Sequence, residues 1–380
     1  MNVALAGAQD FSSFKSKKYF SSLDGLRAAS IALVLLHHVP RYSGPFIRTL
    51  QENGRYGVSF FFVISGFLIC TLLLREEETT GAVDLRAFYL RRALRLLPLY
   101  YAVLIVQAVL VYRFRQYTPE NQALFTYKLP SYVFYYSNWL ASATQGPFFQ
   151  AWSLAVEEQF YVVFGIILAF RSRRFLVGAV LGGLLVKFTA YSLFGPIDAD
   201  STVWRVIFSY REPILLGVLA AVALDGQRGY RLFQGWIGWA GMPLGLGLAI
   251  GGLLCFHEFR HESYWDAQVL YVLMCLTVIC LVVRQSTGLI SGRVAVHVGK
   301  VSYGIYLLHM FVISAVKKWP WGASPAFCLV ASTGVVILLA SVVFRYFEQP
   351  IIAFYKRNMS PLHQSSAGVT PGEGIKIVPA

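Results

Sequence analysis

Leu-Asp-Gly-Leu-Arg-Ala-Ala-Ser-Ile-Ala-Leu-Val-Leu-Leu-His-His, residues 23–38, is an apolar helical stretch with ionisable side chains near both of its ends. A charged side chain at the centre of a membrane span costs roughly 2.5–3.5 kcal/mol, so such residues are kept mainly where they have a role. Arg27 and His38 are eleven positions apart, which corresponds to about three helical turns or ~16 Å of rise. Their side chains therefore fall close to one helical face, and this pattern favours a reaction channel over accidental packing.

Two interpretations of residues 23–38 are open on the sequence alone. In the first, Arg27 extends to the near membrane interface, and His37 and His38 lie in the opposite headgroup layer. In the second, His38 is a general base, because neutral imidazole takes up a proton near physiological pH. Asp24 and Arg27 then belong to the same catalytic site.

The composition indicates an integral membrane protein. The chain has 380 residues, of which 56% are hydrophobic and 14% charged, and its mean hydropathy is +0.56. Soluble proteins carry about 25% charged residues. The net charge of +14 alone would also suit a nucleic-acid-binding protein, but the cations cluster in short loops between apolar runs, as membrane topology requires. We therefore expect no nucleic-acid partner.

Apolar runs long enough to span a membrane recur along the chain. We predict an all-α, polytopic transmembrane bundle of ten spans, at residues 24–40, 57–74, 96–113, 151–170, 175–194, 204–224, 236–256, 267–284, 300–317 and 324–346. Residues 130–141 are aromatic but short, which indicates an interfacial or re-entrant segment. Residues 57–69 hold no ionisable group, and the Ser65-Gly66 pair there is interpreted as packing that lets helices approach closely.

Lys and Arg are more numerous in the loops on the N-terminal side of the first span than in the opposite loops, and cytoplasmic loops carry such an excess. Both termini are therefore predicted to be cytoplasmic, in a multi-pass protein of the cell's inner membrane. The expected organisation is an N-terminal segment (1–22), a membrane domain (23–352) and a polar tail (353–380) that we expect to be disordered.

Three cations stand close together at Arg91, Arg92 and Arg95, and the last two share one helical face. Membrane topology alone accounts for such a cluster. The alternative is an anion clamp, since guanidinium groups bind phosphate bidentately. This interpretation predicts a cytoplasmic site for the phosphates of a nucleotide-linked donor.

Two adjacent carboxylates, Glu157 and Glu158, lie near the start of a predicted span. Neighbouring side chains on a helix diverge by about 100°. At least one of the two should therefore face the bundle interior, where it orients a histidine or pairs with an arginine.

Two other ionisable sites, one with three residues and one with a single histidine, fall within predicted spans. Arg205, Arg211 and Glu212 form the first, for which mutual ion pairing is an open interpretation. The second is His309, which lies in the middle of a span, where a structural role and a functional role are both open.

Six motifs, taken in order, resemble those of a known family. They are Leu-Asp-Gly-Leu-Arg-x10-His from residue 23, Gly-Val-Ser-Phe-Phe-Phe-Val-Ile-Ser-Gly-Phe-Leu-Ile from residue 57, Arg-Arg-x-x-Arg-x-x-Pro from residue 91, Trp-Ser-Leu-Ala-Val-Glu-Glu-Gln-Phe-Tyr from residue 152, Ser-Tyr-Gly-Ile-Tyr-Leu-Leu-His from residue 302, and Phe-Glu-Gln-Pro from residue 347. Over about residues 20–352 the chain resembles the bacterial acyltransferase family three. Its members are membrane O-acyltransferases that modify surface polysaccharides, lipopolysaccharide, peptidoglycan and some small metabolites.

The resemblance implies roles for particular residues. The family's Arg-x10-His motif maps onto Arg27 and His38, so His38 rather than His37 is expected to be catalytic. The family's Arg-x-x-Arg and Glu-Glu motifs map onto Arg92 and Arg95 and onto Glu157 and Glu158. Further site candidates in these motifs and spans are His309, Tyr303, Arg211 and Trp152.

The resemblance also implies an O-acyltransferase with acyl-CoA, most simply acetyl-CoA, as co-substrate, and no metal or permanently bound cofactor. The expected acceptor is a hydroxyl of a carbohydrate or lipid-linked glycan, met within the membrane lipid. Longer relatives carry a C-terminal esterase-like domain, which we expect this chain to lack. Transfer would then finish in the membrane domain or on a separate periplasmic partner.

Two questions of mechanism stay open at this point. Transfer through a covalent acyl-histidine and direct transfer in a ternary complex both suit the motifs. A transporter of acyl groups or lipid-linked sugars would also suit ten spans with buried charges. The arginine cluster and the lack of visible inverted repeats argue against a transporter.

Overall fold

The computed structural model describes residues 10–17, 19–113, 117–140, 144–169, 173–194, 201–207, 209–259, 264–284 and 288–358. Regular structure within these ranges is helical and includes no strand, which confirms the predicted all-α class. The ten helices of the body are α2 (Ser21–His38), α4 (Gly57–Thr80), α5 (Leu85–Arg113), α7 (Ala151–Ala169), α8 (Arg173–Phe194), α10 (Glu212–Asp225), α12 (Met242–Phe256), α13 (Tyr264–Arg284), α15 (Ser302–Val316) and α16 (Pro325–Val343). The connecting helices are α1 (Phe11–Ser16), α3 (Pro45–Asn53), α6 (Pro119–Val133), α9 (Thr202–Ile207), α11 (Gln227–Ile237), α14 (Arg293–Lys300) and α17 (Gln349–Asn358).

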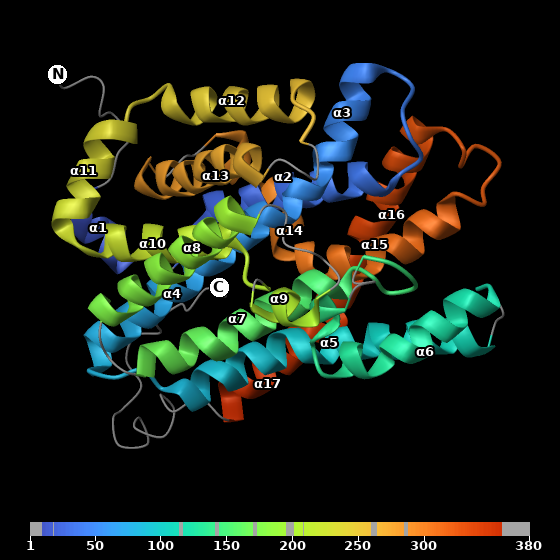
Figure 1. Ribbon diagram of the computed structural model, residues 1–380, viewed down its shortest axis with the longest axis horizontal. Helices are drawn as coiled ribbons and strands as arrows, with labels where there is room; N and C mark the ends of the chain where they lie inside the picture. Colours follow the sequence, from blue (N-terminus) through green and yellow to red (C-terminus); the bar gives the residue numbers. More distant parts are fainter. Residues whose placement is uncertain are drawn as a thin grey trace.

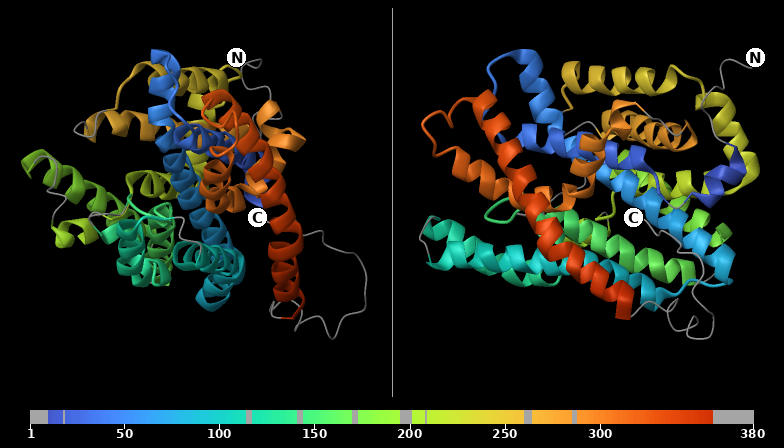
Figure 2. Two further views of the ribbon diagram at one scale, coloured as in Figure 1. Left: turned by 90° about the vertical axis from the view of Figure 1, so that its right-hand side faces the viewer. Right: turned by 180° about the vertical axis from the view of Figure 1, so that it is seen from behind.

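Helices α2 and α4 lie in the middle of the molecule, between two groups of helices (Figure 1). On one side are α11, α12 and α13, and on the other are α5, α6, α7 and α17. The views in Figure 2 show the same order and show α16 crossing the rear face obliquely. This arrangement surrounds α2, which carries both Arg27 and His38, with other helices.

Helices α4 and α10 cross at very close range. A Cβ atom at Gly66 would lie 2.0 Å from the carbonyl oxygen of Ile214, and one at Gly217 would lie 2.2 Å from that of Val63. Both distances are far inside van der Waals contact, so this crossing requires glycine on both helices. The result confirms the prediction that Ser65-Gly66 marks a close helix approach.

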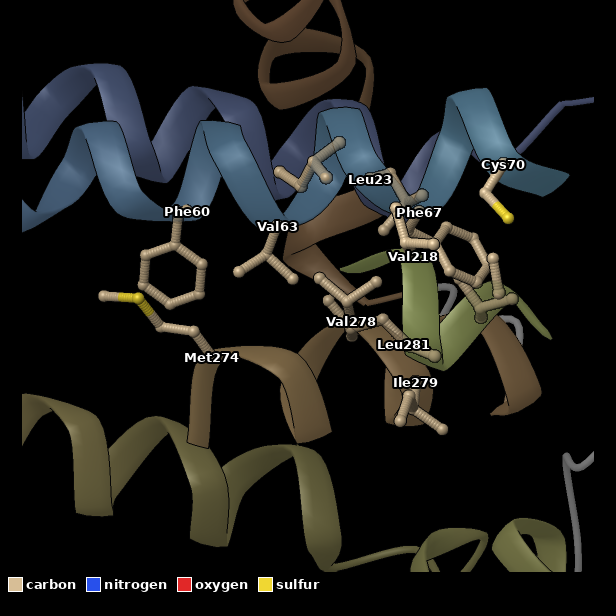
Figure 3. Packing of buried hydrophobic residues seen from close by; sticks show 14 of the residues in the cluster. Leu23, Phe60, Val63, Phe67, Cys70, Val218, Met274, Val278, Ile279 and Leu281 are labelled. Atoms are coloured by element: carbon tan, nitrogen blue, oxygen red, sulfur yellow. The ribbon is translucent and has the colours of Figure 1, made fainter. Parts of the chain in front are cut away.

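Side chains of α2, α4, α10 and α13 form the largest apolar core (Figure 3). Leu23, Val63, Phe67, Val218 and Val278 in this core are each at most 1% exposed. Between membrane helices such side chains stabilise by close van der Waals packing, because lipid tails are as apolar as the side chains themselves. This core holds the first turns of α2 in place, and these turns carry Arg27.

Five helical segments are long and apolar enough to cross a membrane: Pro45–Thr80, Leu85–Arg113, Arg173–Phe194, Tyr264–Arg284 and Pro325–Tyr355. Two further pairs, α11 with α12 and α14 with α15, meet the criterion together but are each bent by 74°. The described residues therefore hold five to seven candidate spans, fewer than the ten predicted. The shortfall falls partly on α2, which carries Asp24 and Arg27, and on α10, which has only 14 residues.

Large apolar side chains also point away from the body on several of these helices. Leu185 and Leu193 of α8 and Val330 and Leu338 of α16 are 64%, 70%, 73% and 68% exposed. Apolar faces of this kind are suited to lipid and unsuited to water. They support the conclusion that the chain is a multi-pass membrane protein.

Two of the predicted segments differ from the helices of the structure. The predicted span 204–224 is broken, because α9 ends at Ile207 and α10 begins at Glu212, with Pro213 in its first turn, where proline has no helical hydrogen bond to lose. Helix α17 continues to Asn358, which lies within the segment 353–380 predicted as the polar tail. The remainder of that tail, residues 359–380, lies outside the described residues.

The segment 130–141 was predicted not to span the membrane. Its described part, residues 130–140, contains the end of α6 and a short 3-10 helix, Ser137–Trp139. It contributes no long helix, in agreement with that prediction.

Candidate active site

A cavity of about 80 Å³ lies where α2, α4, α5, α7, α14 and α15 meet. Four cations line it, namely Arg27 of α2, Arg92 and Arg95 of α5, and Lys300 at the end of α14. We refer to it as the cationic cavity. Its other polar lining residues are Ser65, Ser153, Glu157, Tyr161, Ser302, Tyr303 and Tyr306. The structure thus brings together five of the predicted site residues, Arg27, Arg92, Arg95, Glu157 and Tyr303, from four separate helices.

Arg27 is held in place by Asp24, one turn earlier on α2. The Arg27 guanidinium lies 3.2 Å from a carboxylate oxygen of Asp24, which is only 5% exposed. Asp24 also accepts a hydrogen bond of 2.5 Å from the Tyr19 hydroxyl. Burial and this hydrogen bond raise the pKa of Tyr19, so the phenol stays protonated and remains a donor. Asp24 does not line the cavity, and it contacts the cavity residue Arg27 from behind the lining.

Arg91 does not join the predicted clamp. Arg92 and Arg95 line the cavity, and the Arg92 guanidinium lies 5.2 Å from the ring centroid of Tyr161. Arg91 is exposed and forms a 2.9 Å ion pair with Glu76 at the surface. The reason is geometric, because neighbouring residues on a helix point about 100° apart.

Glu157 and Glu158 diverge as the helical geometry requires. Glu157 lines the cavity and accepts a short hydrogen bond from the Ser65 hydroxyl. Glu158 is half-buried, does not line the cavity, and interacts electrostatically with Arg92. Glu157 is therefore the inward-facing carboxylate. The interpretation of Ser65 as packing alone was wrong, since its hydroxyl orients that carboxylate.

His38 lies at the opposite end of α2 from Arg27 and does not line the cationic cavity. Its ring is in edge-to-face contact with His309 of α15, at 5.0 Å between centroids, and with His37, at 4.9 Å. Nδ1 of His38 lies 2.8 Å from the carbonyl oxygen of Val34. We refer to His38 and His309 as the imidazole pair. Both residues are site candidates on the sequence alone, but their contact is not predicted by it.

Tyr306 connects the cationic cavity with the imidazole pair. Its hydroxyl lies 2.6 Å from the Ser153 hydroxyl at the cavity wall and donates to the carbonyl oxygen of Gln150. One turn further along α15, Nδ1 of His309 lies 2.5 Å from the carbonyl oxygen of Tyr306. Tyr303, on the same face of α15, donates to the carbonyl oxygen of Leu96 at 2.7 Å. Along α15, the cavity residues Tyr303 and Tyr306 are therefore followed one turn later by His309 of the imidazole pair.

Trp152 and Arg211 lie behind the cavity wall. The Arg211 guanidinium stands 5.1 Å from the Trp152 ring centroid, and that ring packs edge-on against Phe62, which lines the cavity. Within the set Arg205, Arg211 and Glu212, for which mutual ion pairing was left open, Glu212 interacts electrostatically with Arg211. Glu212 also pairs with Lys187 at 3.0 Å, because the break before α10 turns its first carboxylate toward α8.

Sequence reasoning missed five polar lining residues, Lys300, Tyr161, Ser153, Ser302 and Tyr306. All five stand inside or directly beside the quoted motifs, and polar side chains in apolar helices are the signal that marks them. Their cavity-facing direction depends on helix rotation, which the sequence does not display. Among the described residues, no three His, Cys, Asp or Glu side chains lie close enough together to hold a metal ion.

The comparisons with known proteins agree with this geometry. Residues 20–346 match the protein family described as the acyltransferase domain. This match covers most of the chain, so the chain belongs to that acyltransferase family. It includes every residue of the cationic cavity and of the imidazole pair.

Similar curated proteins carry related names. A Staphylococcus aureus (strain MRSA252) protein named as a candidate O-acetyltransferase is 29% identical over 381 residues, or 94% of this chain and 61% of the relative. The O-acetyltransferase OatA of Staphylococcus aureus (strain NCTC 8325 / PS 47) is 27% identical over 368 residues, or 88% of this chain and 58% of the relative. The chain thus matches about three fifths of the length of these relatives. No solved structure matches it significantly.

Proposed function

We propose that this protein is a membrane O-acyltransferase. It moves an acyl group, most simply acetyl, from cytoplasmic acyl-CoA to a hydroxyl of a carbohydrate or lipid-linked glycan. The observation that carries the proposal is the placement of a cationic cavity and an imidazole pair along the same two helices, α2 and α15, in a member of an acyltransferase family. The names of the S. aureus relatives support an acetyl group.

The donor binds with its phosphates at the cationic cavity. Arg27, Arg92, Arg95 and Lys300 give this cavity four cations against one lining carboxylate, Glu157. Guanidinium groups bind phosphate through paired, charge-assisted hydrogen bonds. The cavity is well below the about 300–1,000 Å³ of pockets that enclose drug-sized ligands, so it takes a charged part of coenzyme A and leaves the nucleotide outside.

The acyl end of the donor points from the cavity toward the imidazole pair. The separation of the cationic cavity from the imidazole pair can be measured along α15. Tyr303 at the cavity and His309 are six residues apart on this helix, or ~9 Å of helical rise. The flexible pantetheine arm of coenzyme A is suited to such a separation. Phosphate binding at one end then positions the thioester at the other, which is how remote binding energy supports reaction.

His38 is the general base for the acceptor. A carbonyl oxygen only accepts hydrogen bonds, so Nδ1 of His38 donates to Val34 and the lone pair is on Nε2. The acceptor hydroxyl gives its proton to Nε2 while its oxygen bonds to the acyl carbon. The carbon–sulfur bond then breaks, and the coenzyme A thiolate takes the proton.

The expected orientation follows from the same assignment. The Arg27 end of α2 and the arginines of α5 face the cytoplasm, where acyl-CoA is found, and the His38 end faces the opposite leaflet. Both termini are then cytoplasmic, in the inner membrane. The acceptor enters from the lipid or from the periplasmic side, where a separate partner protein can receive the product.

The test uses the purified full chain in lipid vesicles with acetyl-CoA labelled in the acetyl group. Vesicle-bound lipid-linked glycan is the acceptor probe, and coenzyme A release is followed in parallel. The expected result is alkali-labile label on the glycan with an equal amount of free coenzyme A. Label that collects inside the vesicles without ester formation would instead identify a transporter and contradict the proposal.

A further inference from the structure

His309 has an environment that packing alone does not explain. Its side chain is completely buried, at 0% exposure, in the middle of α15. The ring touches His38 at 5.0 Å between centroids, with the two planes at 71°. It also packs on the Tyr306 ring at 5.4 Å. An apolar side chain such as leucine would fill this space without bringing a polar ring into the interior.

The hydrogen bonds fix the tautomers of both rings. Nδ1 of His309 lies 2.5 Å from the carbonyl oxygen of Tyr306, and Nδ1 of His38 lies 2.8 Å from that of Val34. Carbonyl oxygens accept and cannot donate, so both Nδ1 atoms carry a proton. In each ring Nε2 is therefore the atom with a free lone pair.

Nε2 of His309 is a buried acceptor with no hydrogen-bond partner among the described residues. Buried polar atoms are nearly always paired, because an unpaired one loses its hydration without compensation. An unpaired buried acceptor of this kind is expected where a hydrogen-bond donor reaches it during the reaction. The His38 ring lies 5.0 Å away between centroids, and it becomes doubly protonated when it acts as a base.

The charged and titratable groups around His38 favour this partner. Lys317 donates to the His38 carbonyl oxygen at 3.2 Å, and His37 packs against its ring. Phe149 covers another side at 5.7 Å. No carboxylate contacts the His38 ring in the described part of the chain. An imidazolium formed here needs a neutral acceptor, and Nε2 of His309 is placed to serve as one.

We propose that His309 is a positioning residue that stabilises the protonated form of His38 during acyl transfer. This inference rests on the proposed function. The acceptor O–H bond breaks and its proton forms an N–H bond on Nε2 of His38. The new N–H donates to Nε2 of His309 while the acyl carbon–oxygen bond forms and the carbon–sulfur bond breaks. The proton then passes to the coenzyme A sulfur, which restores both neutral rings.

The test compares His309→Leu, His309→Gln and a control, His297→Leu. His297 is also a histidine of this region but is exposed and bonded to Ser341 at the surface. Each purified variant is assayed in vesicles for kcat and for KM of acetyl-CoA, at matched protein amounts and with its Tm measured. Gln is included because its amide oxygen accepts a hydrogen bond where Leu cannot.

We expect kcat of His309→Leu to fall roughly 10- to 150-fold, as for loss of a hydrogen bond to a charged group, with KM for acetyl-CoA unchanged. His309→Gln should recover part of that loss, and His297→Leu should behave as wild type. Wild-type kcat in His309→Leu would overturn the inference. A lower kcat together with a higher KM and a lower Tm in both His309 variants would also overturn the inference, because it would identify a structural role.

The wild-type control separates this inference from the proposed function. If wild-type protein forms the ester and the His309 variants match it, the role of His309 fails and the acyltransferase stands. If wild-type protein forms no ester and releases no coenzyme A, the proposed function fails, and the role of His309 fails with it.

Discussion

Removing the arginines of the cationic cavity should weaken donor binding, while removing their neighbour should not. Arg92 and Arg95 line the cavity, and Arg91 points away from it into a surface ion pair with Glu76. All three carry the same charge on the same helix. Comparison of Arg92→Ala and Arg95→Ala with Arg91→Ala therefore separates a binding site from the general charge of this membrane face.

The size of the effect follows from the contacts. A hydrogen bond to a charged group contributes about 1.5–3 kcal/mol, and every 1.4 kcal/mol changes affinity about tenfold. Loss of one phosphate contact should then raise the Kd for coenzyme A roughly 10- to 150-fold in Arg92→Ala or Arg95→Ala. Arg91 does not line the cavity and pairs with Glu76 at the surface, so Arg91→Ala should leave the Kd for coenzyme A nearly unchanged.

The assay is isothermal titration calorimetry with coenzyme A and purified protein in detergent. Salt near 0.15 M limits long-range attraction, since the Debye length there is about 8 Å. A thermal unfolding scan checks that each variant is folded, because Arg92 also packs on Tyr161. Unchanged affinity in both Arg92→Ala and Arg95→Ala would refute the donor site. An equal loss in Arg91→Ala would show that net charge, rather than the cavity, attracts the ligand.

Three further predictions follow from the same contacts. Glu157→Gln should lower kcat for acetyl transfer more than Glu158→Gln, because only Glu157 lines the cavity; equal turnover in the two variants at matched expression would argue against this assignment. Asp24→Asn should weaken coenzyme A binding in calorimetry through loss of its contact with Arg27, and unaltered binding would mean that Arg27 needs no support. Gly217→Ala should destabilise the fold by about 1–3 kcal/mol or more through overpacking, seen as a lower Tm, whereas Gly182→Ala, with open space around its Cβ, should not; similar Tm values would contradict the tight α4–α10 crossing.

Much of the fold follows from the sequence because apolar runs and their interruptions are local signals. Helices occur near all ten predicted spans, and the interruption between α9 and α10 coincides with the polar residues 209–211 and with Pro213. The described residues hold five to seven candidate spans where ten were predicted. A helix such as α10 is buried by other helices and need not be long enough to cross a bilayer, and hydropathy does not distinguish the two cases.

The site was partly predictable for a related reason. Charges inside apolar stretches are easily seen, so Arg27, Arg92, Arg95 and Glu157 could be named in advance. Which of two adjacent residues faces inward depends on the rotation of each helix, and contacts between helices set that rotation. The assignment of Arg91 to the clamp failed for this reason.

The sequence also does not predict which side chains of different helices pair with one another. The contact of His38 with His309 and the ion pair of Glu212 with Lys187 join residues that are far apart in the chain. They depend on the depth of each helix in the bundle and on close crossings such as that at Gly66 and Gly217. No single segment of the chain encodes those depths.

The most direct test of the central claim is acetyl transfer by His38→Ala and His37→Ala, measured side by side. The two histidines are adjacent, half-buried and at the same end of α2, but only His38 contacts His309, while His37 bonds to the carbonyl oxygen of Gln51. Ester formation from labelled acetyl-CoA is measured at matched amounts of folded protein. We predict a loss of about 10²-fold or more in His38→Ala, as for removal of a general base, and a much smaller change in His37→Ala. Wild-type turnover in His38→Ala, or an equal loss in both variants, would contradict the assignment of His38 as the base.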